Sequence, residues 1–210
     1  MELSIYNIGG SETGRKANLD STVFGVAPNE HVMWLDVKQI LANRRQGTHS
    51  SRERSQMSGS TRKLKRQKGT GGARAGSIKS GTIVGGARIF GPHPRDYHFK
   101  LNKKVKTLAR KSALSSKAKD GGITVIEQFN FDAPKTKSFT EMITNLNLAD
   151  KKFLFVTDDY NKNIYLSGRN LPKGKIVSAG DINTYDLLNC QTVILMEGSV
   201  KKIEELLKKD

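Results

Sequence analysis

A long basic segment in the middle of the chain is the feature that most limits how this sequence can fold. Residues 44–111 hold 19 Lys and Arg side chains against two acids, a net charge of +17. The other 142 residues hold 17 bases and 18 acids, a net charge of −1. Between Arg44 and Arg88 there is no aromatic residue, and the large apolar side chains are Met57, Leu64, Ile78, Ile83 and Val84. These are too few to offset the conformational entropy of folding, so we expect this stretch to be disordered when alone in water.

The charge of the whole chain points to a polyanionic partner. A formal net charge of +16 and a pI near 10.0 in 210 residues are far from the average of soluble proteins. The N-terminus has no apolar run of signal-peptide length, and no window reaches the roughly 18 apolar residues of a membrane span. We therefore expect a cytoplasmic location and no membrane partner. The single cysteine, Cys190, lies in an apolar stretch and is interpreted as a small buried thiol.

Two helices are predicted at the borders of the basic segment. Residues 30–44 follow Asn29 as an N-cap, and they carry apolar side chains at helical spacing: Met33, Val37, Ile40 and Leu41. Residues 101–121 predict a second helix that stops at Gly121. One face of the second helix is apolar, formed by Val105, Leu108, Ala109 and Leu114. Its remaining surface is basic, formed by Lys103, Lys104, Lys106, Arg110 and Lys111.

Short apolar runs alternate with helix-like segments in the C-terminal half. The runs lie at residues 123–127, 152–157, 175–179 and 191–196, and helical spacing or caps occur in 137–148, 159–171 and 181–190. A last helix is predicted at 199–210, with Ser199 as its cap, and "LSIYNI" at 3–8 could add an edge strand. This alternation is typical of a three-layer α/β fold with a largely parallel sheet between flanking helices. We predict a globular α/β domain from residues 1–45 and 98–210, and a long extended basic loop without regular structure at 46–97.

An enzymatic function finds little support in the motifs. "GTGGARAG" at 69–76 is similar to glycine-rich phosphate loops, but it is not a Walker sequence and lacks the flanking strand and helix of a dinucleotide site. Asp158 and Asp159 follow an apolar run and are interpreted as caps of the next helix. The histidines, at positions 31, 49, 93 and 98, are scattered and have no partner set for a metal beyond Asp96. We predict no catalytic residue, metal site, cofactor or small-molecule substrate.

Nucleic-acid binding fits the basic segment better. The segment shows no helix-turn-helix spacing, zinc pattern or aromatic platform, and its cations alternate with Gly, Ser and Thr, as suits threading along phosphates. A solvated linker is the alternative, but aromatic and proline residues at 85–104 indicate a segment that becomes ordered on a surface. The candidate RNA-binding residues are Arg44, Arg45, Arg52, Arg54, Arg62, Lys63, Lys65, Arg66, Lys68, Arg74, Lys79, Arg88, Arg95, Lys103, Lys104, Lys106, Arg110 and Lys111.

Several long motifs resemble a known family. "RQGTHSSRERSQMSGSTRKLKRQKGTGGARAGSIKS" at 45–80, "GPHPRDYHFKLNKKVKTLARKSALS" at 91–115, "DAPKTKSF" and "SGRNL" occur in the order found in the universal large-subunit ribosomal protein L-four family, in its bacterial form. The resemblance implies a non-enzymatic protein of the ribosome whose globular domain binds large-subunit ribosomal RNA. It also implies a basic loop that penetrates the RNA, aids assembly of the subunit and lines the nascent-peptide exit tunnel.

The resemblance also implies roles for residues near the loop tip, which should lie at residues 63–74. It places Arg66, Gln67, Lys68, Gly69 and Thr70 nearest the tunnel and the nascent peptide, opposite a protein of the L-twenty-two family and near the macrolide site. Family members often carry a Pro-Trp pair where this chain has Leu64 and Lys65, and a base where it has Gly72. Two alternatives remain open at this point: an RNA-binding regulator of its own messenger that acts off the ribosome, and an α/β enzyme with a basic insertion.

Overall fold

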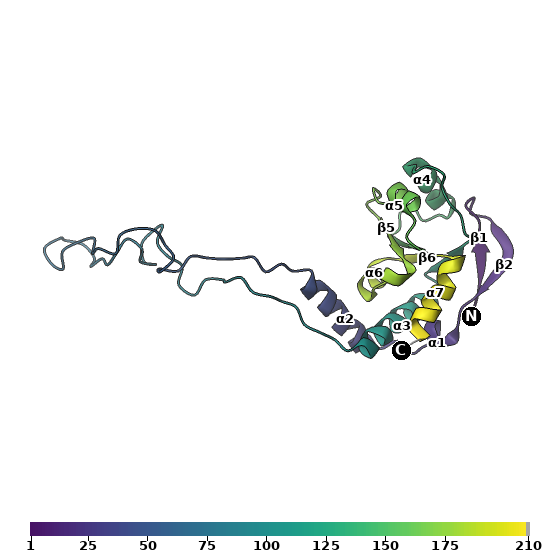
Figure 1. Ribbon diagram of the computed structural model, residues 1–210, viewed down its shortest axis with the longest axis horizontal. Coiled ribbons are helices and arrows are strands. Elements are labelled where there is room, and N and C mark those ends of the chain that lie inside the picture. Colours follow the sequence, from purple (N-terminus) through teal and green to yellow (C-terminus); the bar gives the residue numbers. More distant parts are fainter. Residues whose placement is uncertain (209–210) are drawn as a thin grey trace. The chain divides into compact units, whose positions relative to one another are not determined.

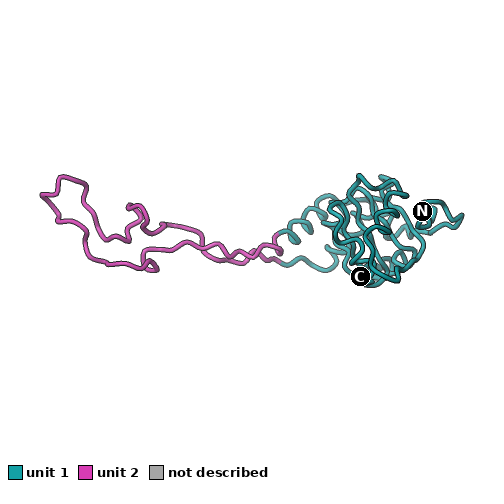
Figure 2. The backbone as a smooth tube through the Cα atoms, turned by 90° about the horizontal axis from the view of Figure 1, so that it is seen from above, with its two compact units in different colours: residues 1–41, 100–210 teal, residues 42–99 magenta. Residues whose placement is uncertain are grey.

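The computed structural model describes residues 1–208 of the chain. These residues divide into two compact units (Figure 2). Unit 1 comprises Met1–Leu41 and the chain from Lys100 onward, and unit 2 comprises Ala42–Phe99. Among the described residues, no helix combines the length and the apolar content that a membrane span requires.

A six-stranded sheet forms the centre of unit 1. Its strands are β1 (Glu2–Tyr6), β2 (Glu12–Asn18), β3 (Ile123–Ile126), β4 (Phe153–Thr157), β5 (Gly174–Ser178) and β6 (Thr192–Met196). They are arranged in the order β2-β1-β3-β6-β4-β5, and every pairing is parallel except that of β1 with β2. All residues of β4 and β6 are buried. Central parallel strands become continuous apolar runs because helices cover both of their faces.

Helices pack on both faces of the sheet and make unit 1 a three-layer α/β fold (Figure 1). On one face, Leu154, Val156, Val193 and Leu195 pack with residues of α1, α2, α3, α6 and α7. On the other face, Phe155 and Ile194 pack with residues of α4 and α5. The helices are α1 (Ser21–Phe24), α2 (Glu30–Asn43), α3 (Lys103–Lys119), α4 (Thr136–Asn145), α5 (Lys162–Gly168), α6 (Thr184–Asn189) and α7 (Glu197–Lys208), with a 3-10 turn at Ala179–Asp181.

The predicted mixed α/β class and its largely parallel sheet are confirmed. The four apolar runs of the C-terminal half are β3, β4, β5 and β6, and the two helices that border the basic segment are α2 and α3. The position of the first strand was wrong: β1 lies between β2 and β3, so the edge is β2. β2 was not predicted because its residues, ETGRKAN, are mostly exposed and do not alternate between apolar and polar side chains.

Some details of the helices also differ from the prediction. α7 begins at Glu197, two residues before the predicted cap, and the buried Ser199 hydroxyl donates instead to the Met196 carbonyl at 2.7 Å. In α2 the Asn29 cap is confirmed by the Val32 amide, which donates to Asn29 Oδ1 at 3.1 Å. The predicted apolar face of α2 is partly wrong, because Leu41 is 43% exposed.

The buried residues of α2 are Met33 and two polar residues, Asp36 and Gln39. Asp36 accepts a hydrogen bond from the buried Thr184 hydroxyl at 2.5 Å, which satisfies its carboxylate inside the unit. In α3 the predicted core residue Leu108 is likewise 38% exposed, and the packed face is formed by smaller side chains such as Ala109 and Ala113. The C-terminal helix was predicted to extend to 210, and residues 209–210 lie outside the described residues.

Two adjacent leucines of α6 test the packing of unit 1. Leu187 is fully buried in the core, whereas its neighbour Leu188 is 41% exposed. We expect Leu187→Ala to lower the free energy of unfolding by about 2–5 kcal/mol, because it leaves a cavity. Leu188→Ala should lower it by less than about 1 kcal/mol, because much of its side chain is already exposed to water and its removal leaves no enclosed cavity. Denaturant unfolding followed by circular dichroism measures both values, and equal losses would contradict the described core.

Candidate nucleic-acid interface

Unit 2 brings most of the predicted RNA-binding residues to the surface. Residues 44–102 contain turns and bends but, within this described range, no helix or strand. Lys79 is half-buried. The other predicted cations of the unit are exposed: Arg44, Arg45, Arg52, Arg54, Arg62, Lys63, Lys65, Arg66, Lys68, Arg74, Arg88 and Arg95.

The cations nearest the middle of unit 2 differ from those of unit 1 in their partners. In unit 1, carboxylates neutralise Lys16, Lys175 and Lys202, through Glu2, Asp186 and the pair Asp158 and Asp159. Across the described residues, by contrast, the salt bridges include none to the cations Arg62, Lys65, Arg66, Lys68 and Arg74. Their charge is therefore available to an external anion such as phosphate.

A hollow of about 610 Å³ lies among these cations. Its wall combines basic and apolar side chains, and a backbone hydrogen bond from the Leu64 amide to the Gly76 carbonyl, 3.0 Å long, joins the two sides of the chain nearby. The lining residues are Gly59, Ser60, Arg62, Lys63, Leu64, Lys65, Arg66 and Ile78. Such a wall can offer donors to phosphate oxygens and an apolar surface to a sugar or base.

Glycines at the apex of this segment are required by their backbone conformation. Gly69 and Gly71 have φ values of +80° and +65°, and a Cβ at either position would meet nothing within 4 Å. The left-handed conformation is what favours glycine there, and the open space leaves the backbone amides accessible. The segment also has no strand before it and no helix after it, which agrees with rejecting a nucleotide-binding loop.

An aromatic cluster joins the two arms of unit 2, the outgoing residues 43–53 and the returning residues 88–98. The guanidinium carbons of Arg45 and Arg95 lie 3.7 Å and 4.7 Å from the centroid of the Tyr97 ring. His49 Nε2 lies 2.8 Å from the Tyr97 hydroxyl. The hydrogen bond to Arg95, together with the charges of Arg95 and Arg45, lowers the pKa of Tyr97. These contacts make cation–π interactions that hold both arginines without neutralising them.

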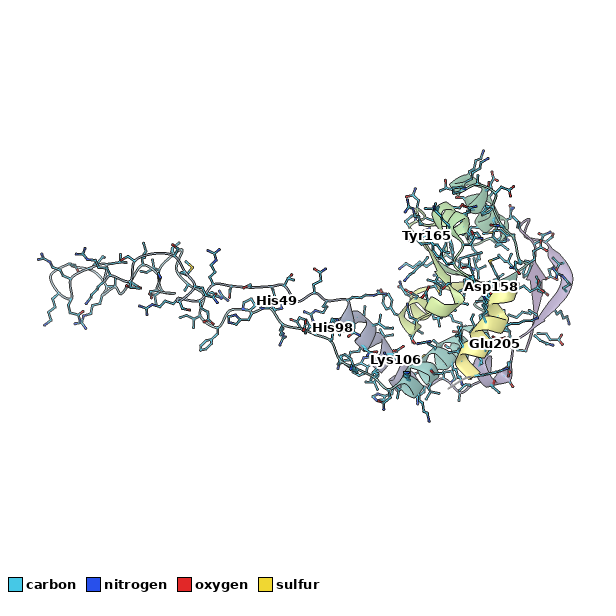
Figure 3. All side chains as sticks on the ribbon, viewed as in Figure 1. His49, His98, Lys106, Asp158, Tyr165 and Glu205 are labelled. Atoms are coloured by element: carbon cyan, nitrogen blue, oxygen red, sulfur yellow. The ribbon has the colours of Figure 1, made fainter. Side chains whose placement is uncertain are left out.

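Backbone hydrogen bonds connect the same two arms. The Arg95 amide donates to the Gly47 carbonyl at 3.2 Å, the Ser51 amide to the Pro92 carbonyl at 2.9 Å, and the Arg88 amide to the Arg52 carbonyl at 3.0 Å. His93 Nε2 lies 2.9 Å from Glu53 Oε1, and His98 Nε2 lies 3.0 Å from the Asn43 carbonyl (Figure 3 labels His49 and His98). We call this set of paired residues, 43–53 and 88–98, the root of unit 2.

The sequence indicated only part of this root. Tyr97 is one of the aromatic residues in the segment 85–104 that was expected to become ordered on a surface, but the roles of His49 and Gly47 were missed. Gly47 has a φ of +65°, and a Cβ there would lie 2.0 Å from the Arg95 carbonyl oxygen. No local sequence pattern predicts such a close approach, because the two residues are far apart in the sequence.

The cations of α3 lie in unit 1. Lys103 and Lys104 are exposed, and Lys106, Arg110 and Lys111 are half-buried. The opposite face of α3 is fixed by packing and by Ser115, whose hydroxyl donates to the Val23 carbonyl and accepts from the Val26 amide, both at 3.1 Å. The helix therefore presents its basic side from a rigid support.

The other candidate features have structural explanations. Asp158 and Asp159 do not cap α5, whose cap is Asn161; they form ion pairs with Lys202 of α7 (Figure 3 labels Asp158). These hydrogen bonds raise the pKa of Lys202. Cys190 is buried and free, as predicted, and burial raises the pKa of its thiol. The described residues include no group of three or more His, Cys, Asp or Glu side chains arranged to hold a metal ion.

A folded α/β unit combined with a basic unit rich in unneutralised cations defines a class, that of components of ribonucleoprotein particles. Comparison with known proteins identifies the family. A family model described as "Ribosomal protein L4/L1 family" matches residues 17–206. Proteins named "Large ribosomal subunit protein uL4" from Phocaeicola vulgatus and Bacteroides fragilis are each 58% identical to this chain, and one from Christiangramia forsetii is 56% identical. Each of these matches covers 99% of this chain and 100% of the relative. The chain belongs to the ribosomal protein L4/L1 family.

Substitution of Gly47 tests the pairing of the two arms. Gly47→Ala places a side chain in the left-handed region, at a cost of about 1–2 kcal/mol, and against the Arg95 carbonyl. We expect exchange of the Arg95 amide hydrogen to become about tenfold faster, as a loss of about 1.4 kcal/mol implies. Hydrogen exchange followed by NMR measures the change.

Gly76→Ala is the matched control, since its φ is not positive and a Cβ there meets nothing within 4 Å. It should leave the exchange of Arg95 unchanged. If the Arg95 amide of the unsubstituted protein already exchanges at the rate of an unfolded chain, the disorder expected from composition extends to the root and the pairing is contradicted.

Proposed function

We propose that this chain is a non-enzymatic, structural component of the large subunit of the cytoplasmic ribosome, where it binds large-subunit ribosomal RNA and aids assembly. In this proposal residues 1–45 and 98–210 form the globular part, and residues 46–97 form a basic loop that lines the nascent-peptide exit tunnel. The observation that carries the proposal is a group of exposed cations in unit 2 that form no salt bridge among the described residues: Arg62, Lys65, Arg66, Lys68 and Arg74. Membership of the family, and the names of relatives that match over their whole length, support it.

Two groups of cations have different roles in this proposal. Those of unit 2 contact phosphates along the loop, where each neutralised phosphate releases counterions and so stabilises the bound state. Those of α3, which are Lys103, Lys104, Lys106, Arg110 and Lys111, attach the globular part to RNA. At the tip, Arg66, Gln67, Lys68, Gly69 and Thr70 face the tunnel and the passing nascent peptide, opposite a protein of the L-twenty-two family.

Removal of the loop tests RNA binding through its dependence on salt. Deleting residues 50–92 removes ten Lys and Arg side chains, and the ends can be joined because Gly47 and Arg95, which lie just outside the deletion, are hydrogen-bonded neighbours. We expect a folded protein that binds large-subunit RNA more weakly. The slope of log affinity against log salt should become shallower by about 0.7–0.9 for each lost phosphate contact. Filter binding over a series of salt concentrations gives both slopes.

A second variant separates the contribution of α3 from that of the loop. Replacing Lys103, Lys104 and Arg110 together by Ala should weaken the binding that remains after the deletion. Circular dichroism checks that both variants retain the fold. An unchanged slope after deletion would contradict the loop as the main phosphate contact, and unchanged affinity after the triple replacement would place the footprint of the globular part elsewhere.

A charge reversal at the tip tests the position beside the tunnel. Lys68 is exposed, so Lys68→Glu should leave the fold of unit 1 intact while it repels neighbouring phosphates and alters the tunnel wall. We expect ribosomes with this variant to change their susceptibility to macrolides severalfold. Lys151→Glu, an exposed lysine of unit 1, is the control and should have no effect. Equal susceptibility of the two variants would contradict a tunnel-facing Lys68.

A further inference from the structure

Helix α2 exposes a row of residues that no predicted function uses. Trp34, Lys38 and Leu41 are separated by four and three positions, so they lie on one face of the helix. Trp34 is 56% exposed and Leu41 is 43% exposed. His31, three positions before Trp34, is also exposed and continues the row toward the start of the helix.

Trp34 is exposed although α2 has a packed face. The buried positions of α2 are occupied by Met33, Asp36 and Gln39, and Asp36 is held by the Thr184 hydroxyl. The half-buried side chains Val32, Leu35, Val37 and Ile40 add to this packing, whereas Trp34, the largest apolar side chain of the helix, remains more than half exposed. An aromatic side chain that keeps most of its surface in water gains little from folding and is suited to a contact outside the chain.

The side chains next to Trp34 indicate which chemical group it would contact. Lys38 Nζ lies 4.8 Å from the centroid of the indole ring, and the ring of His31 lies 6.2 Å away at an interplanar angle of 22°. A flat aromatic surface with a cation one helical turn away matches a nucleobase joined to its phosphate. Aromatic rings stack on unpaired bases, and a neighbouring lysine reaches the backbone.

The charge of the chain that follows α2 favours RNA over an apolar protein surface. The acids of α2 are the buried Asp36 and the exposed Glu30, which lies four positions before Trp34 and so on the same face as the row. In the sequence the helix leads directly to Arg44 and Arg45, the first cations of the basic segment.

We propose that Trp34 stacks on an unpaired nucleobase of the bound ribosomal RNA, with Lys38 contacting the adjacent phosphate. The inference rests on the proposed RNA-binding function and adds to it a base contact on the globular unit, outside the loop and α3. A stacked base is worth about 1–3 kcal/mol, which corresponds to a loss of affinity of about fivefold to 150-fold when the ring is removed.

The intrinsic fluorescence of the full-length protein provides a direct test, because Trp34 is the only tryptophan in the chain. Purified large-subunit ribosomal RNA is the probe: filter retention measures binding and indole emission measures stacking. Free N-acetyltryptophanamide in the same RNA solution corrects for absorbance. We expect emission to be quenched in parallel with binding, and acrylamide to quench the bound protein less than the free protein.

Three variants distinguish stacking from other uses of the row. Trp34→Phe, which keeps a flat ring, should retain most of the affinity, whereas Trp34→Leu and Trp34→Ala should both lose about tenfold. Tyr160→Ala, which removes another exposed aromatic side chain of unit 1, is the matched control and should bind as the unsubstituted protein does.

The outcomes separate this inference from the function on which it rests. Binding with unchanged indole emission, or full affinity of Trp34→Leu, would overturn the stacking contact while RNA binding stands. Full affinity of Trp34→Leu with reduced incorporation of Trp34→Ala into large subunits would assign the row to a protein neighbour instead. Failure of the unsubstituted protein to bind the RNA would overturn the proposed function itself.

Discussion

Mutual repulsion among the cations of residues 44–111 is the constraint on which the rest of this structure depends. Nineteen bases face two acids there, and the sequence has too few large apolar side chains for burial to compensate. The residues outside 44–111 are nearly neutral in sum, and they form most of an α/β unit with helices on both faces of a sheet. Thirteen of the nineteen bases lie in unit 2 and six in unit 1, from Lys100 to Lys111, so most of the excess charge lies outside the part of the chain that builds the core.

The root of unit 2 shows how cations can be brought together without losing their charge. Arg45 and Arg95 lie on different arms, and the ring of Tyr97 contacts both guanidinium groups. Hydrogen bonds between backbone amides and carbonyls join the two arms. A carboxylate in the same place would bind the arginines more strongly and would also compete with phosphate. Among the contacts of the root, Glu53 is the acid used, and its partner is His93. An aromatic ring and backbone groups thus organise the root without neutralising Arg45 and Arg95.

The sequence predicted features that depend on residues close together in the chain, and it missed features that depend on residues far apart. The strands β4 and β6 were predicted because parallel strands covered on both faces must be apolar throughout. The edge strand β2 was missed, since it forms by pairing with β1 and needs no apolar pattern of its own. The buried Asp36 was missed for a similar reason, because its partner Thr184 lies on a distant helix. At the candidate site, composition indicated which side chains carry charge, but the positive φ of Gly47 and its contact with Arg95 depend on residues nearly fifty positions apart.

The division of the core explains why the basic unit can vary without unfolding the protein. Both hydrophobic clusters of the described residues are built from unit 1, and neither includes a residue of 42–99. Met33 fixes α2 in one of these clusters, and Ala113, Leu114 and Ala118 fix α3 in the same one. The two helices that precede and follow the basic segment are therefore secured within unit 1, by this packing and by the hydrogen bonds of Asp36 and Ser115. Since a domain is stable by only about 5–15 kcal/mol, this separation matters. We therefore expect changes of charge in unit 2 to leave that small margin of folding stability untouched.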